Sequence, residues 1–503
     1  MRVSRRLALS AAALLGACTV GPNYAPPKAP VPSAYQETAG KPAAPLSVTT
    51  AGAPDLAAWW SGFHDPTLDS LVTRALADNL DVATAVSRIR AARQQEIIAG
   101  AALYPQIQAS GSVNNTNLSK NAGFSQLAGA FSGGSPGGSS GSGGGAGAPT
   151  QGLGLPGTDF TTYSAGFDAS WELDLFGQTR RSIEAARGRT QAQAWSLRDT
   201  EVSVASEVAV DYLTLRALQQ QIAVADQEAA RQQQLLSLVR SRRVAGFDTR
   251  LEVSQQRNQL ALALAAKPTL EGQARGEIHA LGVLVGQPPE ALSAELTPTG
   301  ATPATPPEVP VGLPSQLLLR RPDVREAERN LAAATADVGV AVGQLYPQIN
   351  LTGSVDLISE SLSNLVSGNS LQTSATAALV QTVFDGGRIR ANIKAVKEAR
   401  IQAWLAYQKT VLGALRDVED ALARYSAEQR RNVQLRAAAE AAQRALGVSE
   451  ARYRSGLSDY INVLTSEGAV FSAQTQLAQS DGQLDQDLVS LYKALGGGWT
   501  TRS

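Results

Sequence analysis

Alternating apolar and polar residues follow two nearly identical segments of the chain. Residues 103–113 and 345–355 share eight of eleven positions, at an offset of 345 − 103 = 242. Tyr-Pro marks the change of pattern in each copy, because proline cannot donate the backbone hydrogen bond that a helix interior needs. Beyond each proline, odd-numbered positions are apolar or small and even-numbered positions are polar. This period of two predicts amphipathic strands at about 104–115 and 346–358.

A longer alternation covers residues 160–176. One face is apolar with aromatic residues near its ends, and the other carries Asp168, Glu172 and Asp174. Some sixteen residues exceed the usual length of a soluble strand, and the aromatic ends are typical of outer-membrane strands. A fourth strand is predicted at about 372–384, where the alternation is poorer. For any one of these segments taken alone, a half-buried strand of a soluble sheet is the alternative.

Helical periodicity covers most of the remaining chain. We predict two pairs of long helices, at 178–244 with 249–285 and at 387–454 with 458–495. Their turn glycines, Gly246 and Gly456, differ by 456 − 246 = 210. A single helix over 178–244 would be ~100 Å long. A narrow apolar stripe on a surface of Ala, Gln, Arg and Glu favours coiled-coil-like packing over burial in a globule. Pro268 is expected to kink its helix.

An earlier helical region is predicted from Asp65, which can cap a helix that has Pro66 at its first position. It runs to about Leu103, with an interruption near Asn79. The pattern divides the chain into a tether and equatorial segment, a first repeat, a linker, a second repeat and a tail. These parts cover residues 18–64, 65–286, 287–320, 321–495 and 496–503.

Composition narrows the possible functions. The 503 residues contain 44 basic and 44 acidic side chains, so no basic excess points to nucleic acid. Aromatic residues make up 5%, which suits long exposed helices better than a large compact core. The only histidines are His64 and His279, and neither a metal-ligand cluster nor a nucleophile–base pair can be proposed. We therefore do not expect an enzyme. A lipoprotein enzyme and a structural coiled-coil lipoprotein without a pore are the competing classes.

The N-terminus predicts a lipoprotein signal peptide over residues 1–17. Three arginines precede a short apolar run, which ends in Leu15-Gly16-Ala17-Cys18. This sequence resembles a bacterial lipobox, in which cleavage precedes the cysteine and acyl chains are attached to it. Cys18 is therefore the expected lipidation site, and this covalent lipid is the only cofactor expected. Thr19, which is not Asp, follows, and this favours the outer membrane.

Four amphipathic strands are too few to close a membrane barrel, which needs about eight. An open edge in lipid would leave backbone groups unpaired. Three copies would supply twelve strands, and the long helices would extend that barrel into a helical tube. The fold class predicted is mainly α with a transmembrane β part. Two polar surfaces, one of strands and one of helices, would make the bore a water-filled conduit.

Motifs along nearly the whole mature chain resemble the TolC-like outer-membrane factor family, in its NodT-type efflux lipoprotein branch. They are Cys18 through Tyr24, Trp59-Trp60 with Phe63 and Asp65-Pro66, Asn79 through Val82, Gly286 through Pro289, Gly312 through Ser315, Leu318 through Val324, Tyr346 through Ile349 and Phe384 through Arg388. The resemblance implies a homotrimer with a twelve-stranded β-barrel, a periplasmic α-barrel and an α/β equatorial belt. It implies an outer-membrane exit channel for drugs, toxic compounds or metal ions, which receives them from an inner-membrane pump through a periplasmic adaptor. A duct for protein secretion is the alternative.

The resemblance also implies that the inner helix-turn tips narrow the periplasmic mouth. Some relatives carry acidic residues six and nine positions after the turn glycine, where this chain has Asn462 and Thr465. Asp459 is the remaining acidic candidate for the constriction, with Leu457 as an apolar plug and with Asn462 and Glu252 beside them. Asp459 as a mere helix cap is the alternative. Asp168, Glu172 and Asp174 are expected to line the barrel lumen, where solvated charge without selectivity is the simpler interpretation.

Overall fold

The computed structural model describes most of the chain as two compact units. The described residues are 19–27, 31–37, 48–50, 56–117, 159–300, 303, 306, 308–312 and 314–499. The sheet unit comprises Met1–Val20, Ile98–Arg180 and Val340–Ile389, and the helical unit comprises Gly21–Ile97, Arg181–Gly339 and Arg390–Ser503. The expected signal peptide, residues 1–17, and the expected lipidation site, Cys18, lie outside the described residues.

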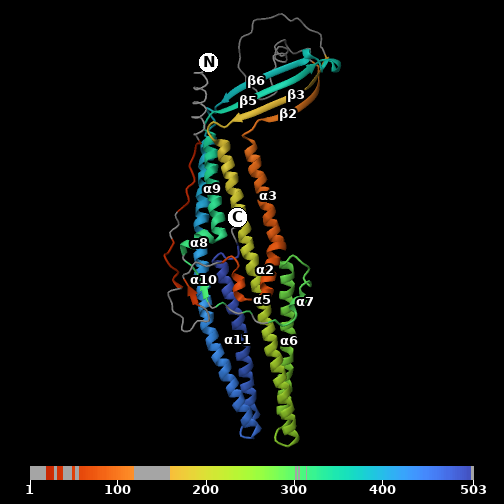
Figure 1. The fold of residues 1–503 in the computed structure, drawn as a ribbon, viewed down its shortest axis with the longest axis vertical. Coiled ribbons are helices and arrows are strands. Elements are labelled where there is room, and N and C mark those ends of the chain that lie inside the picture. The colour runs from red at the N-terminus through yellow and green to blue at the C-terminus, as the bar shows by residue number, and fades with distance from the viewer. Residues whose placement is uncertain are drawn as a thin grey trace. The chain divides into compact units, whose positions relative to one another are not determined.

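Four antiparallel strands form the sheet of the first unit (Figure 1). In sheet order they are β2 (Gln106–Asn117), β3 (Asp159–Leu173), β5 (Gln348–Ser359) and β6 (Leu371–Val380). The offset of 242 found in the sequence holds for both ends of β2 and β5, since 348 − 106 = 242 and 359 − 117 = 242. The repeated Tyr-Pro motif therefore starts two equivalent strands.

The strand register places like residues opposite one another. Ser112 pairs with Ser164 and their hydroxyls lie 2.8 Å apart, while Phe167 pairs with Val355 on the other face. Ser354 pairs with Ser374 at 3.0 Å. Because side chains alternate between faces, even-numbered residues of all four strands share one face and odd-numbered residues share the other. The predicted polar and apolar faces are confirmed.

Two strand ends differ from the prediction by three residues or more. β3 ends at Leu173 and not at 176, so the expected place of Asp174 on a polar strand face is wrong. The Asp174 carboxylate instead accepts from the backbone N–H of Arg180 at 2.9 Å and pairs with its guanidinium at 3.3 Å. This carboxylate therefore caps the first turn of the next helix and is not part of the strand face. β6 ends at Val380, four residues before the predicted limit of 384.

The first helical region is confirmed, including its break. α2 (Pro66–Asp78) has Asp65 as its cap, whose carboxylate accepts from the backbone N–H groups of Thr67 and Leu68 at 2.8 and 3.2 Å. α3 (Leu80–Ala101) starts after Asn79, whose side-chain oxygen accepts from the N–H groups of Asp81 and Val82. Each side chain replaces the helical partners that a first turn lacks.

The long helices form two pairs of matched length (Figure 1). α5 (Gln178–Val244) and α10 (Arg388–Arg454) each have 67 residues, and α6 (Arg250–Leu284) and α11 (Tyr460–Ala494) each have 35. All four bounds repeat at an offset of 210, for example 388 − 178 and 494 − 284. α6 runs through Pro268 without ending there.

None of the helices in the described residues combines the length and the apolar composition that crossing a membrane requires.

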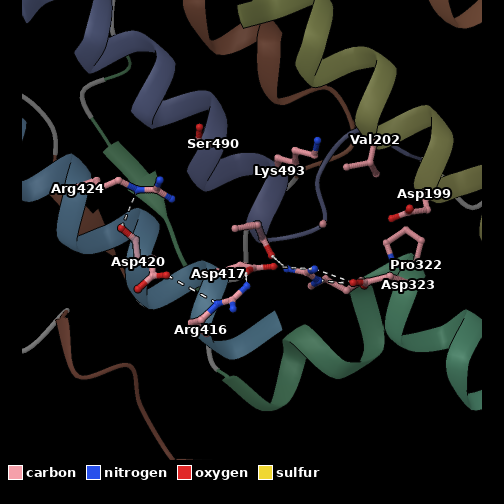
Figure 2. Close-up of a pocket in the computed structure, with 13 residues that line it drawn as sticks. Asp199, Val202, Pro322, Asp323, Arg416, Asp417, Asp420, Arg424, Ser490 and Lys493 are labelled. Atoms are coloured by element: carbon pink, nitrogen blue, oxygen red, sulfur yellow. Dashed lines mark hydrogen bonds and ion pairs between the residues drawn. The ribbon is translucent and has the colours of Figure 1, made fainter. Parts of the chain in front are cut away.

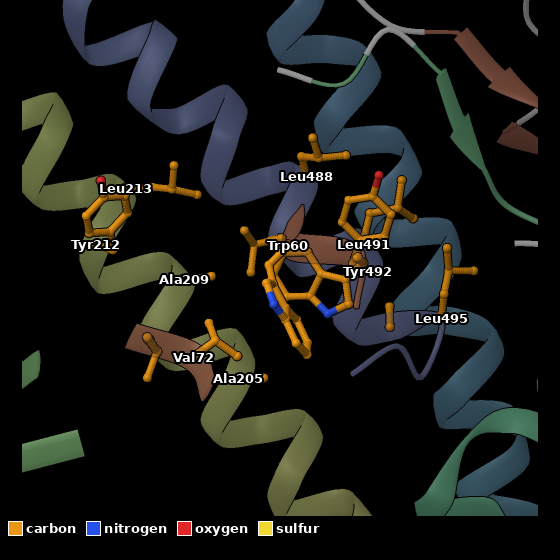
Figure 3. Packing of buried hydrophobic residues seen from close by; sticks show 14 of the residues in the cluster. Trp60, Val72, Ala205, Ala209, Tyr212, Leu213, Leu488, Leu491, Tyr492 and Leu495 are labelled. Carbon is orange, nitrogen blue, oxygen red and sulfur yellow. The ribbon is translucent and has the colours of Figure 1, made fainter. Parts of the chain in front are cut away.

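In the main core of the helical unit, the apolar stripe of α5 packs with buried residues of α2, at the start of the first helical region. The residues that make up the apolar stripe of α5 are all buried, and they are Val204, Val208, Tyr212, Leu215 and Leu218. Aromatic side chains of this core lie among aliphatic ones from α5 and α11 (Figure 3). Aromatic residues contribute much of this core, because their side chains bury the largest areas.

Short elements surround this core. They are β1 (Val48–Thr50) and β4 (Glu308–Pro310), which pair in parallel, η2 (Trp59–Phe63), α7 (Ser293–Leu296), α8 (Pro314–Arg320), α9 (Pro322–Gly343), η3 (Leu362–Asn364) and η4 (Gly368–Ser370). The expected extended tether is held against the helices in its described part. Tyr35 is buried, the N–H groups of Gln36 and Glu37 donate to Glu419, and the hydroxyl of Tyr24 donates to Glu328 at 2.9 Å.

Candidate functional site

Two turns of the helical unit have the same backbone design. The first tip, residues 245–249, joins α5 to α6, and the second tip, residues 455–459, joins α10 to α11. Gly246 and Gly456 have φ angles of +82° and +73°, a region that favours glycine. The N–H of the next residue closes each turn, from Phe247 to the Arg242 carbonyl at 2.9 Å and from Leu457 to the Arg452 carbonyl at 2.8 Å. This is the glycine-based ending typical of helices.

The first tip is fixed by a charged cluster that reaches across to α10. We call Arg242, Asp248 and Tyr453 the tip cluster. Asp248 pairs with the Arg242 guanidinium at 3.2 Å and accepts from the Tyr453 hydroxyl at 2.5 Å. Arg242 also donates to the Tyr453 carbonyl at 3.1 Å and lies 4.3 Å from the centre of its ring. Burial, followed by the bond to Asp248, raises the pKa of Tyr453. The cluster therefore ties the first tip to the last turn of α10.

The expected constriction residue Glu252 serves the start of α6. Thr249 and Glu252 form a reciprocal capping box, in which the Glu252 carboxylate accepts from the Thr249 N–H at 2.8 Å and from the Thr249 hydroxyl. The Thr249 hydroxyl is the largest cause that lowers the pKa of Glu252. This carboxylate has local partners, and it does not line the groove at the second tip.

The other three constriction candidates come together at the second tip. Leu457, Asp459 and Asn462 line an open groove of about 640 Å³. Asp459 occupies the cap position of α11, but its side chain makes no capping hydrogen bond, so the capping interpretation is wrong for its carboxylate. Leu457 is 72% exposed. Asn462 donates to the Ser458 hydroxyl at 2.9 Å. The groove therefore presents an exposed carboxylate, an amide and an apolar side chain.

The lumen candidates that remain on the strands lie on the polar face of the sheet. Asp168 and Glu172 are exposed, and Asp168 accepts from the Ser110 hydroxyl at 3.2 Å. Glu172 pairs in register with Asn350 of β5. They share this face with Asp356, which the register places opposite Gly166. Two of the three expected residues thus face the same side as the serine and threonine pairs.

A cavity of about 420 Å³ lies between α5, α9, α10 and α11 (Figure 2). Its charged lining is balanced, with Arg321, Arg416, Arg424 and Lys493 against Asp199, Asp323, Asp417 and Asp420. Arg321 pairs with Asp323 at 2.7 Å and with Asp417 at 3.3 Å. Such a lining favours neither anions nor cations, so we assign this cavity no ligand. No group of three or more side chains suited to hold a metal ion occurs among the residues that the structure describes.

The tip cluster was not found from the sequence. Asp248 and Tyr453 are 205 residues apart, and no sequence motif links the two positions. The only available signal is the repeat itself, because the offset of 210 shows that the two turns are equivalent and therefore candidates to lie together.

The chain matches a known family over most of its length. Residues 71–287 and 313–497 match the family described as outer membrane efflux protein. The chain belongs to this family. It is 32% identical over 498 residues to the pyoverdine export outer membrane protein OpmQ of Pseudomonas aeruginosa, covering 98% of this chain and 96% of that one. It is 30% identical to nodulation protein T of Rhizobium leguminosarum bv. viciae, covering 97% and 92% of the two chains.

Solved structures of outer-membrane channels share the fold. The channel OprN is 31% identical, with a TM-score of 0.83 and coverage of 96% of this chain and 100% of that one. CusC is 25% identical, with a TM-score of 0.77 and coverage of 96% and 100%. The TolC-like resemblance read from the motifs is confirmed, and the chain is an outer-membrane efflux protein.

Proposed function

We propose that three copies of the chain form the exit duct of a tripartite efflux system. The observation that carries this proposal is the four-stranded sheet. β2 and β6 stand at its two edges, and neither has a partner on its outer side among the described strands. Since an unpaired edge is unstable in lipid, pairing of β6 with β2 of the next copy satisfies both edges. Three copies give twelve strands, an even number within the known range for outer-membrane barrels.

The faces of the sheet fit this closure. Its apolar face carries Phe167, Trp171 and Val355, which are exposed in the single chain and would face lipid. Its polar face, with Asp168 and Glu172, would line a water-filled bore. The helices α5 and α10 of three copies would form a helical tube, since 67 residues at 1.5 Å each span ~100 Å.

The proposed cargo is small molecules or ions. Relatives of this chain are named for pyoverdine export, for antibiotic efflux and for cation efflux. A polar bore needs little chemical recognition, so we assign the choice of cargo to an inner-membrane pump and delivery to a periplasmic adaptor. We propose no cofactor besides a covalent lipid on Cys18, which would anchor the mature chain in the outer membrane.

We propose the two tips as the mouth of the duct. Leu457, Asp459 and Asn462 would narrow it, because they are exposed on the second tip. The tip cluster would hold the first tip in place beside them. Glu252 would act indirectly, by fixing the start of α6.

The deciding experiment is the oligomeric mass of the mature protein in mild detergent, followed by conductance in planar bilayers. We expect a trimer that conducts ions. A stable, folded monomer would contradict the proposal, because four strands per chain cannot close a barrel. A trimer that conducts under no condition would support the proposed assembly but contradict its function as a duct.

A further inference from the structure

Two carboxylates are buried among the four long helices near the tips. Glu228 of α5 is 4% exposed and Glu467 of α11 is 2% exposed. We call them the carboxylate pair. They lie beside an apolar cluster that includes Val239, Val253 and Tyr453. Burial of two acids in one layer is costly unless protons or partners compensate their charges.

One neutral side-chain amide donates hydrogen bonds to both carboxylates. The side-chain nitrogen of Gln232 donates to Glu228 at 2.6 Å and to Glu467 at 2.7 Å. The side-chain oxygen of Gln232 accepts from Gln256 at 2.5 Å, and the oxygen of Gln256 accepts from the Tyr460 hydroxyl. A chain of hydrogen bonds therefore runs from the carboxylate pair to the first residue of α11, which directly follows Asp459 of the second tip.

The charges around the pair are unequal. On α5, Arg231 pairs with Glu228 at 2.7 Å and also donates to Gln474 of α11. On α10, Glu450 is a further negative charge, paired with Arg454 at 2.8 Å. α6 contributes the neutral Gln256, and α11 adds the hydroxyl of Tyr460. Among the described residues no salt bridge reaches Glu467, so its charge is the less compensated of the two.

Burial raises the pKa of Glu467 to about 7, and repulsion from Glu228 and Glu450 adds to the effect. The Gln232 hydrogen bond and Arg231 oppose this shift. A carboxyl whose pKa is raised in the packed form binds a proton there that it releases when exposed. The proton therefore stabilises the packing of this layer fully below the ordinary carboxyl pKa of 4.5, and this stabilisation is lost as the pH rises to about 7.

We propose that the carboxylate pair is a proton-dependent latch that controls how firmly α11 and the second tip are held. When Glu467 is protonated, the pair carries a single negative charge and the Gln232 amide joins α11 to α5. When Glu467 loses this proton to water, two like charges share the Gln232 amide and the start of α11 loosens. The inference rests on the proposed role of the tips as the channel mouth, which would then be tighter at acidic than at alkaline pH.

Hydrogen exchange on the purified protein in detergent tests the latch without requiring conduction. Wild type and Glu467→Gln are compared at the same pH, so that the intrinsic exchange rates cancel. The amide of this variant carries no charge at any pH, and its oxygen can still accept from Gln232. Loss of one proton with a pKa of about 7 changes the opening equilibrium about tenfold between pH 6 and pH 8. Amides of residues 460–470 should already exchange faster in wild type at pH 6, and this ratio should grow about tenfold by pH 8, whereas at pH 4, below the ordinary carboxyl pKa of 4.5, the two proteins should agree.

Two further variants sharpen the test. Glu228→Gln removes the repulsion, so the wild-type transition should move to lower pH, and it carries the test if Glu467→Gln does not fold. Asp211→Asn is the matched control. Burial and the neighbours Glu277 and Glu207 raise the pKa of Asp211 to about 7, but it lies outside this layer. It should leave exchange of residues 460–470 unchanged.

Equal exchange of wild type and Glu467→Gln at pH 8, or the same effect from Asp211→Asn, would overturn the latch. Conductance of the two proteins at pH 6 and pH 8 then separates the two proposals. Higher open probability of wild type at pH 8 supports the latch at the mouth. Equal, pH-independent conduction by both proteins refutes it and leaves the duct intact, whereas absence of conduction at every pH refutes the duct alone.

Discussion

The two tips share a backbone and differ in their side chains. Each closes on a glycine with positive φ, and each is followed by a 35-residue helix. At the offset of 210, Thr249 corresponds to Asp459 and Glu252 to Asn462. The first pair forms a capping box, while in the second pair Asp459 makes no side-chain capping bond and Asn462 turns to Ser458.

This difference indicates that the two tips have different roles, although the repeat makes their backbones alike. Backbone hydrogen bonds and glycine are enough to form either turn, so the side chains are free to vary. At the first tip they are used internally, through Asp248 and its partners. At the second tip they remain exposed toward the groove. We infer that the first tip is a fixed support and the second tip the adjustable part of the mouth.

The largest expected effect comes from breaking the support. Asp248→Ala leaves Arg242, whose side chain is 18% exposed, without its carboxylate and removes the acceptor of Tyr453. Loss of one partner of a mostly buried ion pair costs about 3 kcal/mol. Hydrogen exchange should show a large loss of protection in residues 239–256, and conductance in bilayers should rise.

Asp459→Ala is the matched control for this change. It removes an aspartate carboxylate from the other tip, where the side chain makes no capping bond. Protection of residues 456–466 should stay within about 0.5 kcal/mol of wild type. Equal losses of protection at the two tips would show that the contrast between support and adjustable part is wrong.

An intermediate effect should follow from transferring the capping box. Asn462→Glu gives the second tip the spacing of Thr249 and Glu252, with Asp459 as the cap. A new cap is worth about 1 kcal/mol, so residues 456–466 should gain protection. Thr249→Ala is the reciprocal change and should lose a similar amount at the first tip. No gain from Asn462→Glu would indicate that the exposed geometry of the second tip is imposed by something other than its missing cap.

The smallest effect on stability is expected for Leu457→Ala. Its side chain is 72% exposed, so truncation should change the unfolding free energy by less than about 0.5 kcal/mol. If Leu457 narrows the mouth, single-channel conductance should nevertheless rise. A conductance equal to that of wild type would remove Leu457 from the constriction while leaving Asp459 and Asn462 in place.

Local patterns predicted most of the elements. The helix at 178–244 agrees with the structure at both ends, because Gly177 and Gly246 bound an uninterrupted helical pattern. The strand faces followed from a period of two, which fixes the side of every residue once one is placed. The break predicted near Asn79 is made by capping contacts within four residues of it. Such features depend on residues that are close in sequence, so one sequence is enough to predict them.

Contacts between distant residues were not predictable in the same way. The hydrogen bond from Tyr453 to Asp248 requires helices of different repeats to lie side by side with their ends aligned. The strand prediction extended past Leu173 because Asp174 continues the alternation, although its carboxylate serves the next helix. Asp459 looked like a cap because its position is a cap position, and only the geometry shows that its side chain is not used.

The equal lengths of the paired helices have a consequence for how this chain can change. From the start of the strand to the start of the long helix, the first repeat takes 178 − 106 = 72 residues and the second 388 − 348 = 40. The two repeats thus differ by thirty-two residues there, although their long helices match in length. Between helix start and turn the tolerance is zero, since one heptad removed from α5 alone would shift its tip by ~10 Å against that of α10. An insertion or deletion in one long helix therefore needs a matched change in its partner if the two tips are to stay level, so the two helix lengths can change only together.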